Sequence, residues 1–369
     1  MNRFSKRICL VILLCLSAIA IAAGKNLKGS AEYKPKLQIE KHPTALELLD
    51  KYTQALDSTE SFIASYESVD KFSYHVLGYT PPLIGAKMFR RGQSQSDGRL
   101  KYVREYQWGD FNAQLRNLPK DAPHYNCRVI NDKKSYANSR LVNDPRSKGS
   151  VSCWEGTKKE VFSKNSTNSH ILGFMGSDER LDAVLRGASQ ISVRPATETI
   201  GGSGCYVIDA HTKYGKYSVW LDPEHGYHPI KMNRRAKEGD EYFNRGVLSK
   251  GHIRTAYLDN VRFEKIDGVW IPMEADRGSD DIFGHPKSFS KCDTHFKRTK
   301  IVLNPDHDQL GSFDNPLENP DQDPELVNGT KVRIVGDRAR YTWQDGRVVD
   351  ETGRVIMDSK PKNSKKVER

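Results

Sequence analysis

Apolar and polar residues alternate along most of the chain between residues 71 and 303. A two-residue period places successive side chains on opposite faces of an extended strand, so the pattern predicts strands with one sheltered face. An Asp-Gly pair at 267–268 is a strong hairpin signal between two such segments. The alternating segments are 71–77, 86–91, 99–107, 125–132, 134–142, 150–155, 158–164, 190–195, 205–212, 216–222, 228–236, 252–266, 269–278 and 292–303. We therefore predict a long antiparallel meander.

Two segments have the helical period instead. In residues 42–62, Thr44 and Glu47 have the spacing of a capping box, and apolar residues recur on one helical face. A shorter segment, 176–188, carries Leu181, Val184 and Leu185 on one face, and Gly187 is its expected end. The sequence thus predicts one long amphipathic helix before the meander and one short helix within it.

Two helices cannot cover a dozen strands as a conventional layer, so a sheet of this length should curl around them. The predicted fold class is mainly β, of the α+β type. We expect a large curved antiparallel sheet, or unclosed β-barrel, capped by two or more helices, with a small C-terminal β-hairpin extension. Such an arrangement would leave an apolar hollow between the sheet and the helices.

The stretch 217–235, YSVWLDPEHGYHPIKMNRR, shows the pattern most clearly, because one face of its second arm is apolar and the other is basic. Lys231 and Arg235 should face solvent, while the opposite face should line the hollow. The candidate residues for binding a hydrophobic ligand, continued onto the next strands by parity, are Tyr217, Val219, Leu221, Ile230, Met232, Val261, Phe263, Val269, Ile271 and Met273. An ordinary packed core is the alternative interpretation of the same residues.

The N-terminus has the composition of a secretory signal peptide. A short basic region precedes a fifteen-residue apolar run and small residues, which predicts cleavage near Ala22 or Ala23. An uncleaved anchor is the alternative. Without residues 1–22 the formal charge falls from +11 to +8, because Arg3, Lys6 and Arg7 are lost. We expect an exported protein of the periplasm or cell envelope, with an irregular leader at 23–42 and the main domain at 43–303.

The composition changes after residue 303. Residues 304–329 hold seven acidic residues, four prolines and no Lys or Arg, which predicts a linker with few buried contacts. Residues 330–358 have the pattern of a small β extension, and the basic end, 359–369, is expected to be disordered.

Four cysteines remain after export: Cys127, Cys153, Cys205 and Cys292. An even number in an oxidising compartment favours disulfides, and three pairings are open. We favour Cys127–Cys153, because both lie in neighbouring strand-like segments. Four buried thiols are the alternative.

No combination of residues specifies catalysis or a cofactor. His225 and His228 flank a turn, but a turn does not direct two ligands toward one metal, and the acidic residues at 321–325 lack the glycine and final glutamate of a calcium loop. The chain has no G-x-S-x-G motif. We therefore expect no enzymatic activity, no cofactor, no metal and no nucleic-acid partner.

Three strings together resemble a known family. They are ALELLDKYTQALDSTESFIASYES, CYVIDAHTKYGKYSVWLDPEHGYHPIKMNRR and VRFEKIDGVWIPMEAD. Their order, over residues 43–305, resembles the periplasmic lipoprotein-carrier superfamily (LolA-like, outer-membrane lipoprotein-sorting proteins), with long insertions between 92 and 170. The resemblance implies an unclosed barrel that shelters acyl chains. No functional arginine of that family can be placed on this chain.

The expected function is therefore a non-enzymatic envelope protein that binds acyl chains of lipoproteins or another hydrophobic ligand, and that is a monomer. The alternative is an envelope interaction, structural or sensor protein with a filled core. Such a protein would bind anionic polymer or an anionic membrane surface through its basic face.

Overall fold

The computed structural model describes residues 42–359, except 77–81, 99, 111–112, 114–118, 132–133, 143, 145, 156–178, 243–245 and 285–287. The predicted signal peptide, almost all of the leader, the strand expected at 158–164 and nearly all of the basic tail lie outside the described residues. The described residues between 43 and 359 belong to one compact unit, which contains every helix and strand of the described chain.

The first helix is α2 (Ala45–Asp57), and its N-terminus is the predicted capping box. The Glu47 amide donates to Thr44 Oγ1 at 3.2 Å, and the Thr44 amide donates to Glu47 Oε2 at 2.7 Å. These bonds satisfy two amides that the first helical turn would otherwise leave without partners. The second helix, α5 (Leu181–Arg186), ends at Gly187 as predicted.

The described residues form eighteen strands, and β6 and β15 are the parallel pair among their ladders. In chain order they are β1 (Ser61–His75), β2 (Leu83–Asp97), β3 (Lys101–Trp108), β4 (His124–Ile130), β5 (Lys134–Leu141), β6 (Ser150–Glu155), β7 (Gln190–Val193), β8 (Glu198–Ile200), β9 (Ser203–Thr212), β10 (Gly215–Asp222), β11 (His228–Lys237), β12 (His252–Ile266), β13 (Val269–Phe283), β14 (Phe289–Leu303), β15 (Lys331–Ile334), β16 (Tyr341–Gln344), β17 (Arg347–Asp350) and β18 (Val355–Asp358).

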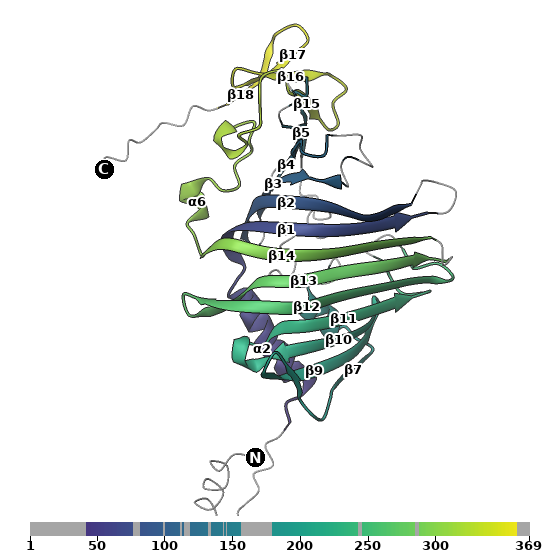
Figure 1. The fold of residues 1–369 in the computed structure, drawn as a ribbon. Helices are drawn as coiled ribbons and strands as arrows, with labels where there is room; N and C mark the ends of the chain where they lie inside the picture. The colour runs from purple at the N-terminus through teal and green to yellow at the C-terminus, as the bar shows by residue number, and fades with distance from the viewer. Residues whose placement is uncertain are drawn as a thin grey trace, which may run out of the picture. The chain divides into compact units, whose positions relative to one another are not determined.

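The ladders join these strands into one sheet. From one edge, β7 and β8 both pair with β9, and β10, β11, β12, β13 and β14 follow in order. Strand β14 then pairs with β1, and β2 to β6 continue the sheet. Strands β15 to β18 complete it (Figure 1). The predicted antiparallel meander is thus confirmed for β9–β14 and β1–β6, with β1 inserted beside β14.

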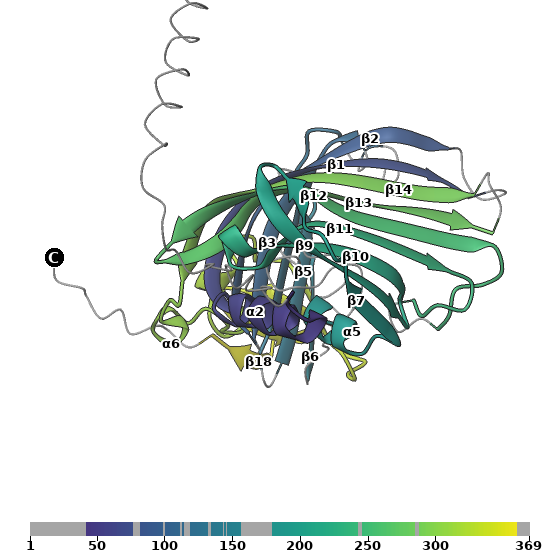
Figure 2. The same cartoon turned by 90° about the horizontal axis from the view of Figure 1, so that it is seen from below.

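The sheet curves around its helices and stays unclosed (Figure 2). Helix α2 contacts β7, β11 and α5, and α5 contacts β9, so both helices lie on one face, which we call the inner face. The predicted fold class, mainly β with a large curved sheet and few helices, is confirmed. At the β12–β13 turn, Asp267 and Gly268 have φ of 50° and 83°, as the Asp-Gly signal predicted.

Residues 304–329 differ from the linker that their composition suggested. They include the short helix α6 (His307–Leu310), and they bury Phe313, Leu317 and Asp323 against β3–β6 and β15–β17. The prediction of few buried contacts is therefore wrong. Hydrogen bonds to side chains hold this segment in place, and such bonds leave no helical or strand period in the sequence. The predicted boundaries at 303 and 329 stay predictions.

The disulfide prediction is wrong, because Cys127, Cys153, Cys205 and Cys292 are all thiols in the structure. Cys127 lies on β4 and Cys153 on β6, with β5 between them. Two strands apart is about 10 Å, whereas a disulfide needs Cα atoms within about 7 Å. The alternative of buried thiols applies to Cys127, Cys153 and Cys205, and Cys292 is partly exposed.

Candidate ligand-binding site

The inner face has an apolar part beneath the two helices. Leu48, Leu49 and Tyr52 of α2 are fully buried there, together with Leu181 and Leu185 of α5. The strands β9–β12 supply the opposing side chains, so helices and sheet share one core cluster. Lys51 Nζ donates to Tyr227 Oη at 2.8 Å and attaches α2 to the β10–β11 turn.

The structure divides the predicted ligand-binding residues between two clusters. Those packed with α2 and α5 are Tyr217, Val219, Leu221, Ile230, Met232, Val261 and Phe263. Those packed with Phe62 and Ala64 of β1 and Ile301 and Leu303 of β14 are Val269, Ile271 and Met273. The first group lies together as the parity of the hairpin predicted. A bulged register between β12 and β13 separates the second.

The inner face continues from this apolar part into a polar part. Register places Tyr217 opposite Arg234, and Arg234 opposite Ala256, so the three side chains share the inner face. Arg234 is 2% exposed and donates from Nε to the Tyr214 carbonyl at 2.8 Å. Two residues along β12 from Ala256, Arg254 lies 3.3 Å from Asp281. Burial lowers the pKa of Arg234, because a charged guanidinium loses its hydration there.

A second polar group lies farther along the same face. Arg90 Nε is 2.6 Å from Asp70 Oδ2, and Thr294 donates to Asp70 Oδ1 at 2.6 Å. Register sets Arg277 beside Thr294, and Arg298 opposite Tyr66. Burial lowers the pKa of Arg277 and lowers that of Arg298 far below its ordinary value, and the neighbouring Arg277 charge adds to the effect at Arg298.

Sequence reasoning missed these inward arginines. The hairpin was interpreted as basic on its outer face, and Lys231 and Arg235 do lie on the more exposed parity. Arg234 has the parity of Ile230 and Met232, so the alternation itself contained the signal. A charged residue at an inward position is rare unless it is paired. The inward parity of Arg234 was therefore the signal in the sequence that could have identified this site.

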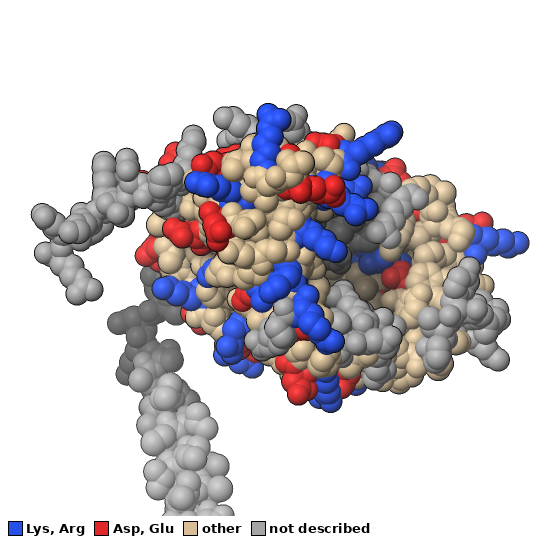
Figure 3. All heavy atoms as spheres, turned by 90° about the horizontal axis from the view of Figure 1, so that it is seen from above, with Lys and Arg blue, Asp and Glu red and all other residues tan. Residues whose placement is uncertain are grey.

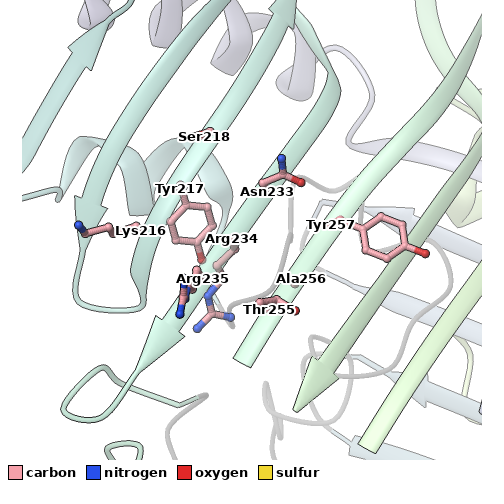
Figure 4. A pocket seen from close by; sticks show the side chains of 9 residues that line it. All are labelled: Lys216, Tyr217, Ser218, Asn233, Arg234, Arg235, Thr255, Ala256 and Tyr257. Atoms are coloured by element: carbon pink, nitrogen blue, oxygen red, sulfur yellow. The ribbon is translucent and has the colours of Figure 1, made fainter. Parts of the chain in front are cut away.

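A pocket of about 400 Å³ lies over β10, β11 and β12 (Figure 4). Its lining residues are Lys216, Tyr217, Ser218, Asn233, Arg234, Arg235, Thr255, Ala256 and Tyr257. Register places six of the nine, including Lys216 and Arg235, on the outer face, and Tyr217, Arg234 and Ala256 between them point inward. We therefore assign this pocket to the outer face of the sheet, where its charged side chains are basic.

The turn that carried the two histidines does not assemble a metal site from the described residues. His225 Nδ1 lies 2.6 Å from Asp222 Oδ2, and its ring stacks on Phe263 at 4.8 Å. His228 is buried, and the loss of hydration lowers its pKa to about 4. The Ser203 hydroxyl contacts Glu224 at 3.4 Å, so its hydrogen bond in the described chain goes to a carboxylate and not to His225.

Comparison with known proteins finds no matching family model and no matching curated protein. Solved structures with limited similarity include lipovitellin, titled for lipid–protein interactions, at 7% identity and a TM-score of 0.25. The match covers 67% of this chain and 26% of lipovitellin, so this chain spans about a quarter of that protein's length. Similarity at that TM-score establishes neither a shared fold nor a shared function.

Two further structures contain MucB. The Pseudomonas aeruginosa MucA/MucB complex matches at 10% identity and a TM-score of 0.22, over 70% of this chain and 99% of that chain. MucB bound to MucA(peri) matches at 10% identity and 0.19, over 70% and 98%. These values are also too low to assign a family, and the resemblance to LolA-like carriers stays a prediction. Among the described residues, no helix is long and apolar enough to span a bilayer.

Proposed function

We propose that this protein is a non-enzymatic, exported envelope protein that binds acyl chains or another hydrophobic ligand on the inner face of its sheet. One observation carries the proposal: a large apolar surface of a curved, unclosed sheet is covered by only two helices in the described chain, one of them six residues long. A cover of this size can move aside at the cost of few contacts, which is what a carrier requires.

The attachment of α2 supports the same proposal. Lys51 and Tyr227 form an exposed hydrogen bond between the helix and the β10–β11 turn. Arg186 of α5 contacts Asp50 of α2 at 2.7 Å, also near the surface. Exposed polar contacts of this kind contribute little stability, about 0–1 kcal/mol each, so they align the helix without locking it.

The experiment is mass spectrometry of organic extracts from natively purified protein, with titration of a fluorescent long-chain fatty acid. Val219→Phe adds a ring beneath α2 and should weaken probe binding about tenfold or more, since it occupies the space a chain needs. Val302→Phe, at a position 43% exposed on β14, is the matched control and should bind as the natural protein does. Extracts without lipid, together with no probe binding, would end the proposal.

A second candidate function has its own observation. Val219 and Leu221 are completely buried, as they would be in a permanently filled core. The protein would then act as an interaction, structural or sensor protein, and the basic outer pocket at Lys216 and Arg235 would meet an anionic membrane or polymer. The Lys216→Gln/Arg235→Gln double variant should then lose binding to phosphatidylglycerol vesicles. Unchanged vesicle binding would exclude that role for the pocket.

A further inference from the structure

A second pocket, of about 270 Å³, lies between the sheet and the segment that covers its β3–β6 end. Strands β1 to β3 form one wall, where register places Gln95 and Arg104 on a single face. Residues 310–322 form the opposite wall, with Ser312 and Asp321 among them. This face of the sheet is opposite to the one that α2 covers, so the pocket is separate from the proposed acyl-chain site.

Hydrogen bonds hold both walls of this pocket in place. Tyr102 Oη of β3 donates to the Gln322 carbonyl at 2.9 Å, and the neighbouring Asp323 is the buried acceptor for three donors of β4 and β5. Near α6, His307 Nε2 donates to the Ser96 carbonyl at 2.8 Å. The pocket is thus preformed, and a ligand that enters it does not have to order the chain first.

Opposite charges line this pocket without pairing. Elsewhere along the same cover, a basic side chain of the sheet pairs with an acidic one of the segment, since Arg140 Nη1 lies 3.2 Å from Glu325 Oε2. Arg104 and Asp321 line one pocket, yet within the described chain neither has an ion pair or a side-chain hydrogen bond. The pocket therefore holds a cation and an anion apart, and both are available to a ligand.

Two uncharged side chains of the walls carry buried atoms that also lack partners. Gln95 is 9% exposed and Ser312 is 2% exposed. Gln95 Oε1 and Ser312 Oγ make no hydrogen bond with any described residue. Such atoms are rare in folded proteins, because their lost hydration is not compensated. A carboxamide and a hydroxyl each offer both a donor and an acceptor, so these side chains suit a ligand with polar groups of both kinds.

Basic and acidic side chains are interspersed on the surface at this end of the molecule. Figure 3 shows this mixture, seen from the end at which β15–β18 lie in Figure 1. In the pocket, a purely anionic ligand would meet the carboxylate of Asp321, and a purely cationic one would meet the guanidinium of Arg104. A zwitterion presents an opposite charge to each, so the two side chains favour a ligand that carries both charges.

We propose that this pocket binds a free α-amino acid. Its carboxylate accepts from the Arg104 guanidinium, which can donate two parallel hydrogen bonds, and its ammonium group pairs with Asp321. Gln95 and Ser312 gain the hydrogen-bond partners that they lack. The pocket is slightly smaller than the about 300–1,000 Å³ that is typical of sites for drug-sized ligands, so it suits a molecule of this size. This polar site is additional to the acyl-chain site and does not rest on it.

The test begins with a thermal-unfolding screen of the whole chain against the standard L-amino acids at millimolar concentration, because a ligand that binds only the folded protein raises its Tm. Calorimetric titration then compares the amino acid that gives the largest shift with its N-acetyl derivative and its carboxamide. We expect each derivative, which lacks one of the two charges, to bind about tenfold or more weakly. Absence of a shift with every amino acid would overturn the proposal.

Variants assign the two charges. Asp321→Asn should weaken binding of the amino acid about tenfold and leave binding of the N-acetyl derivative unchanged, since that ligand has no ammonium group. Arg104→Gln should weaken the amino acid by a similar factor and spare the carboxamide. Asp308→Asn and Arg333→Gln make the same charge changes at exposed side chains outside the pocket, and they should bind as the natural protein does.

The Asp321 variant keeps the test decisive if Arg104→Gln unfolds, because Asp321 is exposed. Equal weakening of the amino acid and of its N-acetyl derivative by Asp321→Asn would overturn the assignment of the ammonium group to this carboxylate. The same loss of binding in Asp308→Asn would show a general effect of charge and would also overturn the site.

Discussion

The two ends of the sheet are covered in opposite ways. At the β9–β12 end, α2 and α5 cover the inner face with aliphatic side chains, such as Leu48 and Leu185. At the β3–β6 end, residues 304–329 and β15–β17 cover the other face. Tyr102 lies on that face, because the register sets it opposite Gln95. Gln95 in turn lies opposite Ile63, and Ile63 lies opposite Val302. One cover is a pair of regular helices and the other is mainly irregular chain.

The irregular cover is held by hydrogen bonds to one buried carboxylate. Asp323 is 1% exposed and accepts from Tyr125 Oη at 2.8 Å, Tyr136 Oη at 2.6 Å and Asn138 Nδ2 at 2.8 Å. Burial raises the pKa of Tyr125 and Tyr136, so both hydroxyls remain protonated donors. Apolar contact lets a cover slide, whereas a buried polar site fixes its position. We therefore expect the helical cover to move and the irregular cover to stay.

Removing the irregular cover should have the largest effect. A chain ending at Pro305 loses Phe313, Leu317, Val332 and Trp343 from the core cluster at β3–β6. We expect hydrogen exchange in β4 and β5 to rise about a hundredfold or more, while β9–β11 stay protected. A chain ending at Ser359 keeps that whole cluster and serves as the control. Full protection of β4 and β5 in the shorter chain would show that the two ends do not differ in this way.

Leu221→Ala tests how tightly the helical cover packs. Leu221 is completely buried, so in a filled core its truncation should cost about 2–5 kcal/mol of unfolding free energy. Urea unfolding measures this change. Val302→Ala, at a partly exposed position on β14, should stay within about 0.5 kcal/mol. A cost for Leu221→Ala of less than about 1 kcal/mol would reveal space beside it and sharpen the case for a mobile cover.

Asp323→Ala tests the polar anchor at the other end. Three buried donors lose their acceptor, and each costs about 1–3 kcal/mol when left unsatisfied, so we expect a loss of about 3 kcal/mol in urea unfolding. Asp321→Ala removes an exposed carboxylate two residues away and is the matched control. If the two variants were equally stable, the carboxylate would not anchor the segment.

His228 makes the helical end sensitive to acid. Its pKa falls from 6.5 to about 4 on folding, through the loss of hydration, so between these values the unfolded chain binds the proton more tightly. Its contribution is therefore complete above about pH 6.5 and lost as the pH falls through about 4, a change of about 3 kcal/mol. Urea unfolding at both pH values should show a smaller acid loss for His228→Gln than for the natural protein. His295→Gln, at a half-exposed ring, should behave as the natural protein does.

Thr44→Ala should have the smallest effect. It removes the side-chain half of the capping box of α2, which costs about 1 kcal/mol. Thermal unfolding should show the loss, and Thr44→Ser, which keeps the hydroxyl, should restore most of it. If the helical cover moves as we propose, Thr44→Ala should also raise the association rate of a fatty-acid probe, because a less stable helix opens more often.

The sequence could predict what depends on local period and local chemistry. Alternation predicted the strands, the helical stripe and capping box predicted α2, and the parity of the β10–β11 hairpin predicted that Val219, Leu221 and Met232 lie together. The curved, mainly β fold followed from too few helices for so many strands. Each of these inferences rests on residues close together in the chain, where side-chain direction follows from backbone geometry.

Only the tertiary structure decided how distant segments meet. The insertion of β1 beside β14, the separation of Cys127 from Cys153 by β5, and the arginines gathered on the inner face all depend on the order of strands in the sheet. The acidic segment looked like a linker because a buried carboxylate and three donors from β4 and β5 leave no periodic trace in the sequence. Hydrogen bonds between residues almost 200 positions apart are specified by packing, and local pattern carries no information about them.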